Sequence, residues 1–377
     1  MKTVGALLWG VDQPWSVEEI DIGDPSRDEV LVRMEAAGLC HCDHQVSTGS
    51  LPTGGFPVLG GHEGSGVVVG VGRDVRDISV GQHVVLSSVP SCGQCTYCSA
   101  GHPLTCVRAS QLPSGRAISD SSFRVRARGR DVYPFALLGA FSPYAVVHRT
   151  SVIPVDPDIP FDIACLLSCS IATGWGAVTR AAGVRPGDDV VVIGLGGVGM
   201  AALRVAAAAG ARHVFGIDPV EWKRSLAVEW GAHSAYADLA TATAEVAALT
   251  GGRMAAKVIV ASGQPSGKDL DAWMSLTSKG GTCVLASVAD VRMFDVTVNL
   301  AIQTLMQKRL QGTLCGDGDP HHDVRLLASM HQAGRLNLDG FVTRQYRLAD
   351  INDGYRDLLE GRNVRGIIRY SDADWAD

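Results

Sequence analysis

VVVIGLGGVG, at residues 190–199, is the segment from which the architecture of this chain follows. An apolar run typical of a buried strand ends at Ile193, and three glycines follow it with the spacing G-x-G-x-x-G. An Ala-rich helical pattern comes next, so the glycines occupy a turn from strand to helix. Such a turn lets the backbone approach a pyrophosphate, whose charge is met by the helix N-terminus. The predicted dinucleotide-binding residues of this loop are Gly194, Gly196, Gly197, Val198 and Gly199.

The next predicted strand, HVFGID, ends at Asp218, where a carboxylate can bind the adenosine ribose hydroxyls. Because Asp218 would repel a 2′-phosphate, we expect NAD rather than NADP. Lys223 lies a little over one helical turn further and either reaches the same ribose or is a solvated helix charge. Further units of strand and helix continue to about Leu314 and predict a parallel sheet with right-handed crossovers.

The flanking segments have a different texture. Residues 1–170 alternate short β-rich runs with Gly, Pro and Asp, which predicts a mostly antiparallel β domain, and residues 315–377 return to a mixed pattern. We therefore expect a doubly wound domain at 171–314, inserted into a domain formed by the two flanking segments. A length of 377 residues, 46% of them hydrophobic, suits two such domains, and the expected fold class is α/β.

Composition excludes several classes of function. The formal net charge of -6 offers no overall basic footprint, so nucleic acid is not an expected partner. The apolar segment 200–211 contains Arg204 and is shorter than the roughly 20 residues that a bilayer helix needs, so no membrane span is expected. The chain begins MKTVGALLWGVDQPW, without a basic and apolar leader, which predicts a cytoplasmic protein whose ten cysteines are reduced.

Four cysteines lie in a lobe at about residues 91–110 that is too polar to fold around a core of its own. Their spacing, C-x2-C-x2-C-x7-C, can place four thiolates around one tetrahedral zinc ion. Because such a set leaves no open position, the site is predicted to be structural, with metal binding holding the lobe together. An iron–sulfur cluster is the alternative, but no proline follows the last cysteine and no second cysteine set is present. The predicted ligands are Cys92, Cys95, Cys98 and Cys106.

A second set of metal-binding residue types is dispersed along the chain: Cys40 in GLCHCDH, His62 and Glu63 in GGHEGSG, and Cys169 in LLSCSIATG. Taken singly, such residues are more often buried core side chains than ligands. Together, two thiolates and one imidazole are the ligand class of a catalytic zinc ion that keeps a fourth position open. Glu63 is a candidate exchangeable carboxylate, and Asp43 a candidate acceptor that orients His62 through its other ring nitrogen.

The chain resembles the zinc-dependent medium-chain alcohol dehydrogenases over essentially its whole length. The resemblance rests on GHEGSGVVVGVG, the lobe with four cysteines, CSIATGWGAV, GLGGVG and the closing NVRGII. More narrowly, IDPVEWKR, LMQKRLQG and INDGYRDLLEGRNVRGII resemble the nicotinoprotein branch, the nitrosodimethylaniline-dependent enzymes of actinobacteria. The resemblance implies a GroES-like β domain with an inserted Rossmann domain, and an active site in the cleft between them.

The resemblance also implies cofactors, partners and site residues. It implies one catalytic and one structural zinc ion, and NAD that stays bound and passes electrons to an external redox carrier, thought to be mycofactocin. A small alcohol or carbonyl compound would be the substrate, and the Rossmann domain would join the chains of a homodimer or homotetramer. By this resemblance Cys40, His62 and Cys169 hold the catalytic zinc with Glu63 beside it. The cofactor would contact His41, Thr173 and Arg365, and the substrate pocket would include Leu51, Ser88 and Val288.

The expected activity is hydride transfer between a primary or secondary alcohol, or the matching aldehyde or ketone, and NAD. Two departures from the family concern the proton. Cys42 stands where the family has a Ser or Thr that receives the alcohol proton, and Gln45 stands where liver-type relatives continue the relay with a His. A thiol is a poorer hydrogen-bond relay than a hydroxyl. An alternative is therefore a redox-neutral enzyme that uses zinc as a Lewis acid for elimination, isomerisation or addition.

Two further groups of side chains have residue types that can bind anions or metals. The period-two spacing of Arg124, Arg126, Arg128 and Arg130 places them on one face of an extended segment, which either holds an anion or is a solvated hairpin face. His321 and His322 are expected to be surface residues of a polar loop. The remaining cysteines, predicted to be small buried hydrophobes, are Cys165, Cys283 and Cys315.

Overall fold

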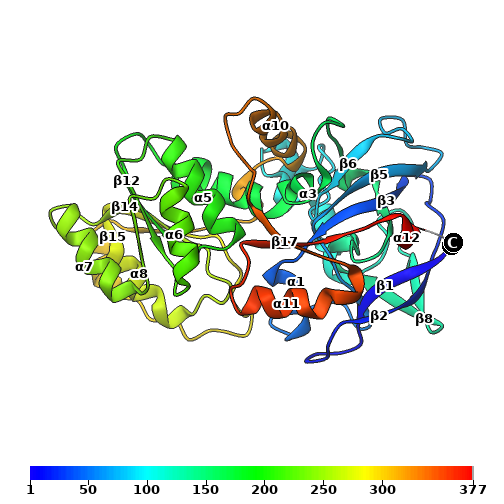
Figure 1. Ribbon diagram of the computed structural model, residues 1–377, viewed down its shortest axis with the longest axis horizontal. Coiled ribbons are helices and arrows are strands. Elements are labelled where there is room, and N and C mark those ends of the chain that lie inside the picture. The colour runs from blue at the N-terminus through cyan, green and yellow to red at the C-terminus, as the bar shows by residue number, and fades with distance from the viewer. Residues whose placement is uncertain (376–377) are drawn as a thin grey trace. The chain divides into compact units, whose positions relative to one another are not determined.

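The structure is a computed structural model that describes residues 1–375. The chain forms two compact units, drawn in Figure 1. Unit 1 comprises Met1–Cys169 together with Gly318–Asp377, and unit 2 comprises Ser170–Asp317. Among the described residues, no helix has the length and apolar character needed to cross a bilayer.

Unit 1 contains a closed barrel and a larger sheet. The barrel follows the order β1 (Lys2–Leu8), β2 (Ser16–Ile22), β7 (Val125–Ala127), β8 (Arg130–Pro134) and β4 (Val58–Leu59). The sheet follows the order β10 (Val152–Pro154), β6 (His83–Leu86), β5 (Gly64–Val71), β3 (Glu29–Gly38), β18 (Arg365–Arg369) and β17 (Val342–Tyr346), with β9 (Tyr144–His148) also paired to β3. Most pairs are antiparallel, as predicted, whereas β4–β8 and β17–β18 are parallel.

Short helices complete unit 1 around this sheet. They are α1 (His41–Ser47), α2 (Thr96–Ser99), α3 (Phe161–Ala164), α10 (Pro320–Gln332), α11 (Ile351–Leu359) and α12 (Asp372–Trp375). Alternate residues of β3, Val30, Val32 and Met34, are fully buried in one core cluster that also contains Phe141 and Tyr355. Strand β18 pairs with the end of β3, so the C-terminal segment belongs to the same core as the N-terminal one.

Unit 2 is a six-stranded parallel sheet. Its order is β13 (Ser234–Tyr236), β12 (His213–Ile217), β11 (Asp189–Ile193), β14 (Ala255–Val260), β15 (Thr277–Leu285) and β16 (Arg309–Gly312). The helices are α4 (Ala172–Gly176), α5 (Gly197–Ala208), α6 (Glu221–Glu229), α7 (Leu239–Leu249), α8 (Leu270–Leu276) and α9 (Leu300–Leu305). This order is that of a doubly wound Rossmann sheet, so the predicted fold class is confirmed.

The apolar run at residues 190–193 is buried along its whole length because the sheet is covered on both faces. Val191 and Ile193 belong to a core cluster with side chains of α7 and α8, whereas Val192 lies beside Gly199 of α5. Both faces of β11 therefore need apolar side chains, which explains why this strand reads as a continuous run.

The arginine run lies on the hairpin of β7 and β8, which agrees with the predicted hairpin face and not with one continuous extended segment. The chain reverses at Arg128 and Gly129, whose φ values are 51° and 73°, and the alternation of a single strand is interrupted there. The ion pairs are Arg124 with Glu29 and Asp120, Arg126 with Asp131, and Arg128 with Glu18. These three arginines serve to neutralise carboxylates of unit 1.

The two adjacent histidines lie in the first turn of α10, not in the predicted loop. Asp319 caps this helix by accepting a hydrogen bond from the His321 backbone N–H at 2.9 Å, and Pro320 begins it. Asp followed by Pro also occurs in turns, but an Asp cap with Pro in the first helical position is equally a helix start.

Candidate metal and dinucleotide sites

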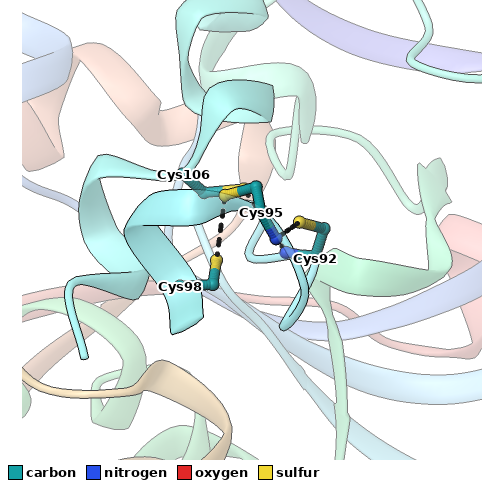
Figure 2. Close-up of side chains that lie close together, drawn as sticks. All are labelled: Cys92, Cys95, Cys98 and Cys106. Atoms are coloured by element: carbon teal, nitrogen blue, oxygen red, sulfur yellow. Dashed lines mark hydrogen bonds between the residues drawn. The ribbon is translucent and has the colours of Figure 1, made fainter. Parts of the chain in front are cut away.

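The side chains of Cys92, Cys95, Cys98 and Cys106 converge at α2, as Figure 2 shows. Their sulfur atoms all lie within 4.8 Å of one another. Cys95 Sγ is 3.5 Å from Cys98 Sγ and 3.9 Å from Cys106 Sγ. Sulfur ligands of a tetrahedral zinc ion, with Zn–S bonds of about 2.3 Å, are separated by about 3.8 Å. The four side chains therefore have the spacing of a closed zinc site.

Backbone N–H groups that donate to these sulfur atoms favour negative charge on them. The Cys95 N–H donates to Cys92 Sγ at 3.3 Å, and the Cys92 N–H donates to Cys106 Sγ at 3.4 Å. Backbone N–H groups at Cys98 and Val107 hold the pKa of Cys95 down to about 6, whereas burial and Cys95 raise the pKa of Cys98 to about 12. Without a cation the four groups cannot all be thiolates, and a divalent ion would remove that conflict.

A second cluster of metal-binding groups is completely buried in unit 1. One ligand atom from each of Cys40, His62, Glu63 and Cys169 lies within 4.8 Å of the others. Cys169 Sγ is 3.5 Å from His62 Nε2, and Glu63 Oε1 is 3.9 Å from the same nitrogen. The structure thus brings together side chains that are dispersed over more than a hundred residues of sequence. None of the ten cysteines, all of which lie in the described part of the chain, forms a disulfide.

Asp43 fixes the orientation of His62. The Asp43 Oδ2 atom lies 3.0 Å from His62 Nδ1, and Oδ1 accepts a hydrogen bond from the Gly61 backbone N–H at 2.9 Å. Burial opposes charge on the imidazole, but the Asp43 carboxylate and the Cys40 thiolate together raise the pKa of His62 well above its usual range. With Nδ1 facing Asp43, the His62 ring has its Nε2 atom 3.5 Å from Cys169 Sγ, which is the orientation that a metal-binding histidine requires.

Glu63 is paired with Arg365 inside the same buried site. The Arg365 guanidinium contacts the Glu63 carboxylate, and both side chains are buried. Burial raises the pKa of Glu63 to about 7, and Arg365 opposes that rise. This pairing places a cation beside the candidate metal ligands, which sequence spacing did not indicate. The contact of Arg365 with a pyrophosphate stays a prediction.

Two local features of this site could not be predicted from the sequence motifs. Cys169 lies in a π-helical turn, Leu167–Ile171, a rare geometry that often occurs at functional sites. The Phe135 ring packs edge-on against the His62 ring, with 5.3 Å between centroids. No motif pointed to Phe135, because its position depends on how the chain passes the site after β8.

The glycine loop of unit 2 has the geometry of a dinucleotide-binding turn. Gly194 has a φ of 89°, and a Cβ atom there would lie 2.7 Å from the Ser262 backbone. A Cβ on Gly199 would collide with the Gly194 carbonyl oxygen, whereas Gly196 faces open space. Gly196 precedes the first residue of α5, Gly197, so the N-terminus of a twelve-residue helix follows the loop. The loop backbone is therefore open to a phosphate group.

Asp218 and Lys223 lie near this loop. The Asp218 carboxylate accepts hydrogen bonds from the backbone N–H groups of Leu195 at 2.8 Å and Val220 at 2.9 Å. This position, at the end of β12, holds the carboxylate rigidly beside the loop. Lys223 is 7% exposed, so it is not a solvated helix charge. Burial lowers the pKa of Lys223, and Asp218 opposes that shift.

Comparison with known proteins agrees with these two sets of residues. Residues 26–157 match the family described as alcohol dehydrogenase GroES-like domain, and residues 197–333 match the family described as zinc-binding dehydrogenase. Alcohol dehydrogenase B of Mycobacterium tuberculosis (strain ATCC 25618 / H37Rv) is 54% identical over 374 residues, which are 99% of this chain and 100% of that protein. The chain belongs to the alcohol dehydrogenase family.

Further members of the alcohol dehydrogenase family are similar over their whole length. The NDMA-dependent alcohol dehydrogenase of Amycolatopsis methanolica is 39% identical over 372 residues, covering 98% of this chain and 100% of that protein. The crystal structure of benzyl alcohol dehydrogenase from Acinetobacter calcoaceticus has a TM-score of 0.89 and 27% identity, with 98% of this chain and 100% of that chain covered. The family predicted from the sequence, including its nicotinoprotein-like branch, is confirmed.

The remaining predicted site residues of this alcohol dehydrogenase lie on helix α1, elsewhere in unit 1, and in unit 2. Helix α1 carries His41, Cys42, Asp43 and Gln45, of which Asp43 and Gln45 are buried. In unit 1, Leu51 packs partly buried against the main core and Ser88 is buried. In unit 2, Thr173 is buried in α4, whereas Val288 is 37% exposed.

Proposed function

We propose that this chain is a zinc-dependent alcohol dehydrogenase that transfers a hydride between the carbinol carbon of a primary or secondary alcohol and NAD. The observation that carries the proposal is the buried cluster of Cys40, His62, Cys169 and Glu63. Two thiolates, one imidazole and one exchangeable carboxylate are the donor set of a catalytic zinc ion. The names of two whole-length relatives, Alcohol dehydrogenase B and NDMA-dependent alcohol dehydrogenase, support the same reaction.

The residues present fit two zinc ions with different roles. Cys40, His62 and Cys169 would hold the catalytic ion, and Cys92, Cys95, Cys98 and Cys106 would hold the structural ion. When bound, the catalytic zinc supplies a Lewis acid that lowers the pKa of the alcohol, and NAD supplies the hydride acceptor. The all-cysteine set has no ligand that exchanges readily, so its contribution is to the folding of the lobe.

The other buried residues prepare the ligands for this reaction. Asp43 holds the His62 ring with Nδ1 toward its own carboxylate, leaving Nε2 as the donor atom. Arg365 holds Glu63 and balances its charge when the carboxylate is ionised. Glu63 could thus approach or leave the metal without leaving an uncompensated buried charge.

Cys42 is proposed as the residue that receives the alcohol proton, in the place of the family's Ser or Thr. It lies in the first turn of α1, directly before Asp43. A thiol donates and accepts hydrogen bonds weakly, so proton transfer through this position would be slower than through a hydroxyl.

NAD would bind along the glycine loop from Gly194 to Gly199, with Asp218 and Lys223 at the adenosine ribose. The open backbone at Gly196 and the N-terminus of α5 suit the pyrophosphate. His41, Thr173 and Arg365 would contact the cofactor at other points. We further propose that NAD stays bound between turnovers and is reoxidised by an external redox carrier, because the Amycolatopsis relative is an NDMA-dependent enzyme.

The substrate pocket would include Leu51, Ser88 and Val288. The small Ser88 suggests room for an alcohol bulkier than ethanol, and the similarity to a benzyl alcohol dehydrogenase is in keeping with this. The redox-neutral alternative, with zinc acting in elimination, isomerisation or addition, is not favoured, since the relatives are named as dehydrogenases.

We propose that the protein is a cytoplasmic homodimer or homotetramer joined through unit 2. Strand β16 lies at the edge of its sheet, and several apolar side chains of residues 294–314 are exposed. They include Phe294, Leu300, Leu305, Leu310 and Leu314, of which Phe294 is 89% exposed. An unpaired strand edge with exposed apolar groups is a surface that proteins usually cover.

The decisive experiment is a single-turnover measurement on protein purified without added NAD. Zinc and NAD are quantified first, and a panel of alcohols that includes ethanol and benzyl alcohol is then mixed with the protein. Growth of the absorbance band of reduced nicotinamide is expected, and its discharge on addition of NDMA would establish the bound cofactor as the turnover site. Lack of reduction with every alcohol, even after NAD is added, would contradict the proposal.

A further inference from the structure

Two adjoining hollows lie in unit 2 at the end of the sheet where the strands begin. Their volumes are about 640 and 480 Å³, and both are lined by Asp188, Ala256, Ser278 and Lys279. The glycine loop follows the last residue of β11, whereas the hollows adjoin its first residue, Asp189. At about 3.3 Å per residue, the five residues of this strand separate the hollows from the glycine loop by roughly 16 Å. The hollows are therefore distinct from the dinucleotide loop.

Positive charge is concentrated around these hollows although the chain as a whole carries a net charge of -6. The cationic lining residues are Arg185, Arg212, Arg253, Lys257, Lys279, Lys308 and Arg309. The carboxylates that line the hollows are those of Asp188 and Asp189. Such an excess of cations is costly in the absence of an anion, because like charges in a concavity reinforce one another's potential.

Both carboxylates are already engaged by neighbouring groups. Asp189 lies 3.0 Å from the Arg212 Nε and 2.9 Å from His213 Nδ1, and Asp188 accepts a hydrogen bond from the Arg185 backbone N–H at 2.9 Å. Within residues 1–375, none of the other six cations forms an ion pair with a carboxylate; these are Arg185, Arg253, Lys257, Lys279, Lys308 and Arg309.

Two of these cations are held in place by neutral acceptors. Lys308 Nζ donates to the Met274 carbonyl oxygen at 2.5 Å, and Arg309 Nη2 donates to the Gly280 carbonyl oxygen at 2.8 Å. Burial lowers the pKa of Lys257; Asp188 opposes this shift, and the cations Arg309 and Arg185 add to it. Lys308 and Arg309 are thus held at the hollows, and the positive charge of the lining exceeds that of its two carboxylates.

We propose that these hollows bind a phosphorylated small molecule with an apolar organic part. Lysine and arginine side chains are the usual ligands of phosphate, and arginine binds it through two parallel N–H groups. Met254, Ile302 and Met306 line the larger hollow and provide an apolar wall for the organic part. The volumes lie within the range of about 300–1,000 Å³ that small-molecule sites occupy, and a concave site suits a compact ligand better than a protein surface.

The test uses the assembled, NAD-saturated protein, in which the glycine loop is already filled. Isothermal titration with AMP and with inorganic phosphate compares ligands of similar charge that differ in the organic part. We expect AMP to bind at one site per chain, at least tenfold more tightly than phosphate, and to weaken as NaCl is raised. No binding of AMP, or AMP binding no more tightly than phosphate, would overturn the proposal.

Charge-removing variants locate the site. Lys279→Gln, at the position shared by both hollows, and Lys257→Gln are each expected to weaken AMP binding about tenfold, as the loss of one charged contact does. Lys268→Gln is the matched control, because Lys268 is an exposed lysine of unit 2 that does not line the hollows. Equal affinities for all three variants would overturn the assignment. Alcohol turnover is expected to be unchanged in all three variants, so a failure here is distinguishable from a failure of the proposed dehydrogenase activity.

Discussion

The carboxylate of Asp43 contacts both the His62 ring and the backbone of Gly61. Its Oδ2 atom lies 3.0 Å from His62 Nδ1, and its Oδ1 atom accepts a hydrogen bond from the Gly61 N–H at 2.9 Å. Asp43 is completely buried, so neither oxygen can exchange its partner for water. The orientation of the imidazole is therefore fixed before a metal ion arrives, and the cost of ordering this ligand is met during folding.

Asp43→Asn is expected to lower the affinity of the buried site for zinc by a factor of about 10 to 100. The asparagine amide keeps the shape of the side chain but removes the negative charge that lies 3.0 Å from His62 Nδ1. Competition with a chromophoric chelator measures the affinity. Asp77→Asn, a change of the same charge at an exposed position of unit 1, serves as control. If both variants bind zinc as the unmodified protein does, Asp43 has no role in holding the ligand.

Cys98→Ser is expected to remove one zinc ion per chain and to make the lobe around residues 92–106 sensitive to proteases. The reason is that three sulfur ligands and a hydroxyl bind zinc far more weakly than four thiolates, and the lobe has little core of its own. Metal analysis and limited proteolysis followed by mass spectrometry report the two effects. Cys315→Ser is the control, which tests whether the loss of a cysteine outside this set also removes zinc or exposes the lobe to proteases. Retention of full zinc content by Cys98→Ser would contradict a four-cysteine site.

Cys42→Ser is expected to increase the turnover of alcohols, because a hydroxyl is a better proton relay than a thiol. The increase should be largest where proton release limits the rate, so kcat and kcat/KM are measured separately across a pH series. Zinc and NAD contents of the variant are compared first, since an altered metal site would also change the rate. Unchanged or reduced turnover at equal zinc and NAD content would show that Cys42 is not the limiting point of the relay.

Lys223→Met is expected to raise the stability of cofactor-free protein at pH 7.5, with a gain that diminishes toward pH 10.5. Burial lowers the pKa of Lys223 below its ordinary value of 10.5. Between the folded-state pKa and 10.5, the unfolded chain binds more protons than the folded one, so the lysine protein gains stability as pH rises and approaches the variant.

Urea unfolding midpoints at several pH values measure this difference. Lys268→Met controls for the general loss of a positive charge, because Lys268 is exposed and its pairing with Asp295 is on the surface. A Lys223→Met advantage that is constant, or that grows between pH 7.5 and 10.5, would mean that burial of the ammonium group is not what costs stability.

Much of the fold could be predicted because its signals are local. The glycine loop, the strand before it and the helix after it are contiguous, and the spacing of the four cysteines lies within fifteen residues. In both cases the residues that act together are neighbours in sequence, so periodicity and spacing contain the relevant geometry. The dispersed candidate zinc ligands were inferred from their residue types and from the family resemblance, because spacing alone does not reveal that they lie close together.

The features that could not be predicted depend on tertiary contacts. The pairing of Glu63 with Arg365 joins positions separated by 302 residues, and no local pattern indicates that the two side chains contact each other. The sequence left Lys223 either as a ribose contact or as a solvated helix charge, and only its burial in the folded chain, near Asp218, excludes the second. Period-two spacing does not reveal where the arginine run turns, because the left-handed conformation of Arg128 is not apparent from it.

The pairing of β18 with β3 has a consequence for the order of events during synthesis on the ribosome. The end of β3 near Gly38 cannot pair with residues 367–369 until they are synthesised, which happens only after the whole of unit 2. Unit 2 is continuous in sequence and can complete its sheet first, while the earlier part of unit 1 still exposes a strand edge. A nascent chain stalled before β18 would therefore contain all the proposed zinc ligands yet lack Arg365 and the strand that pairs with the end of β3.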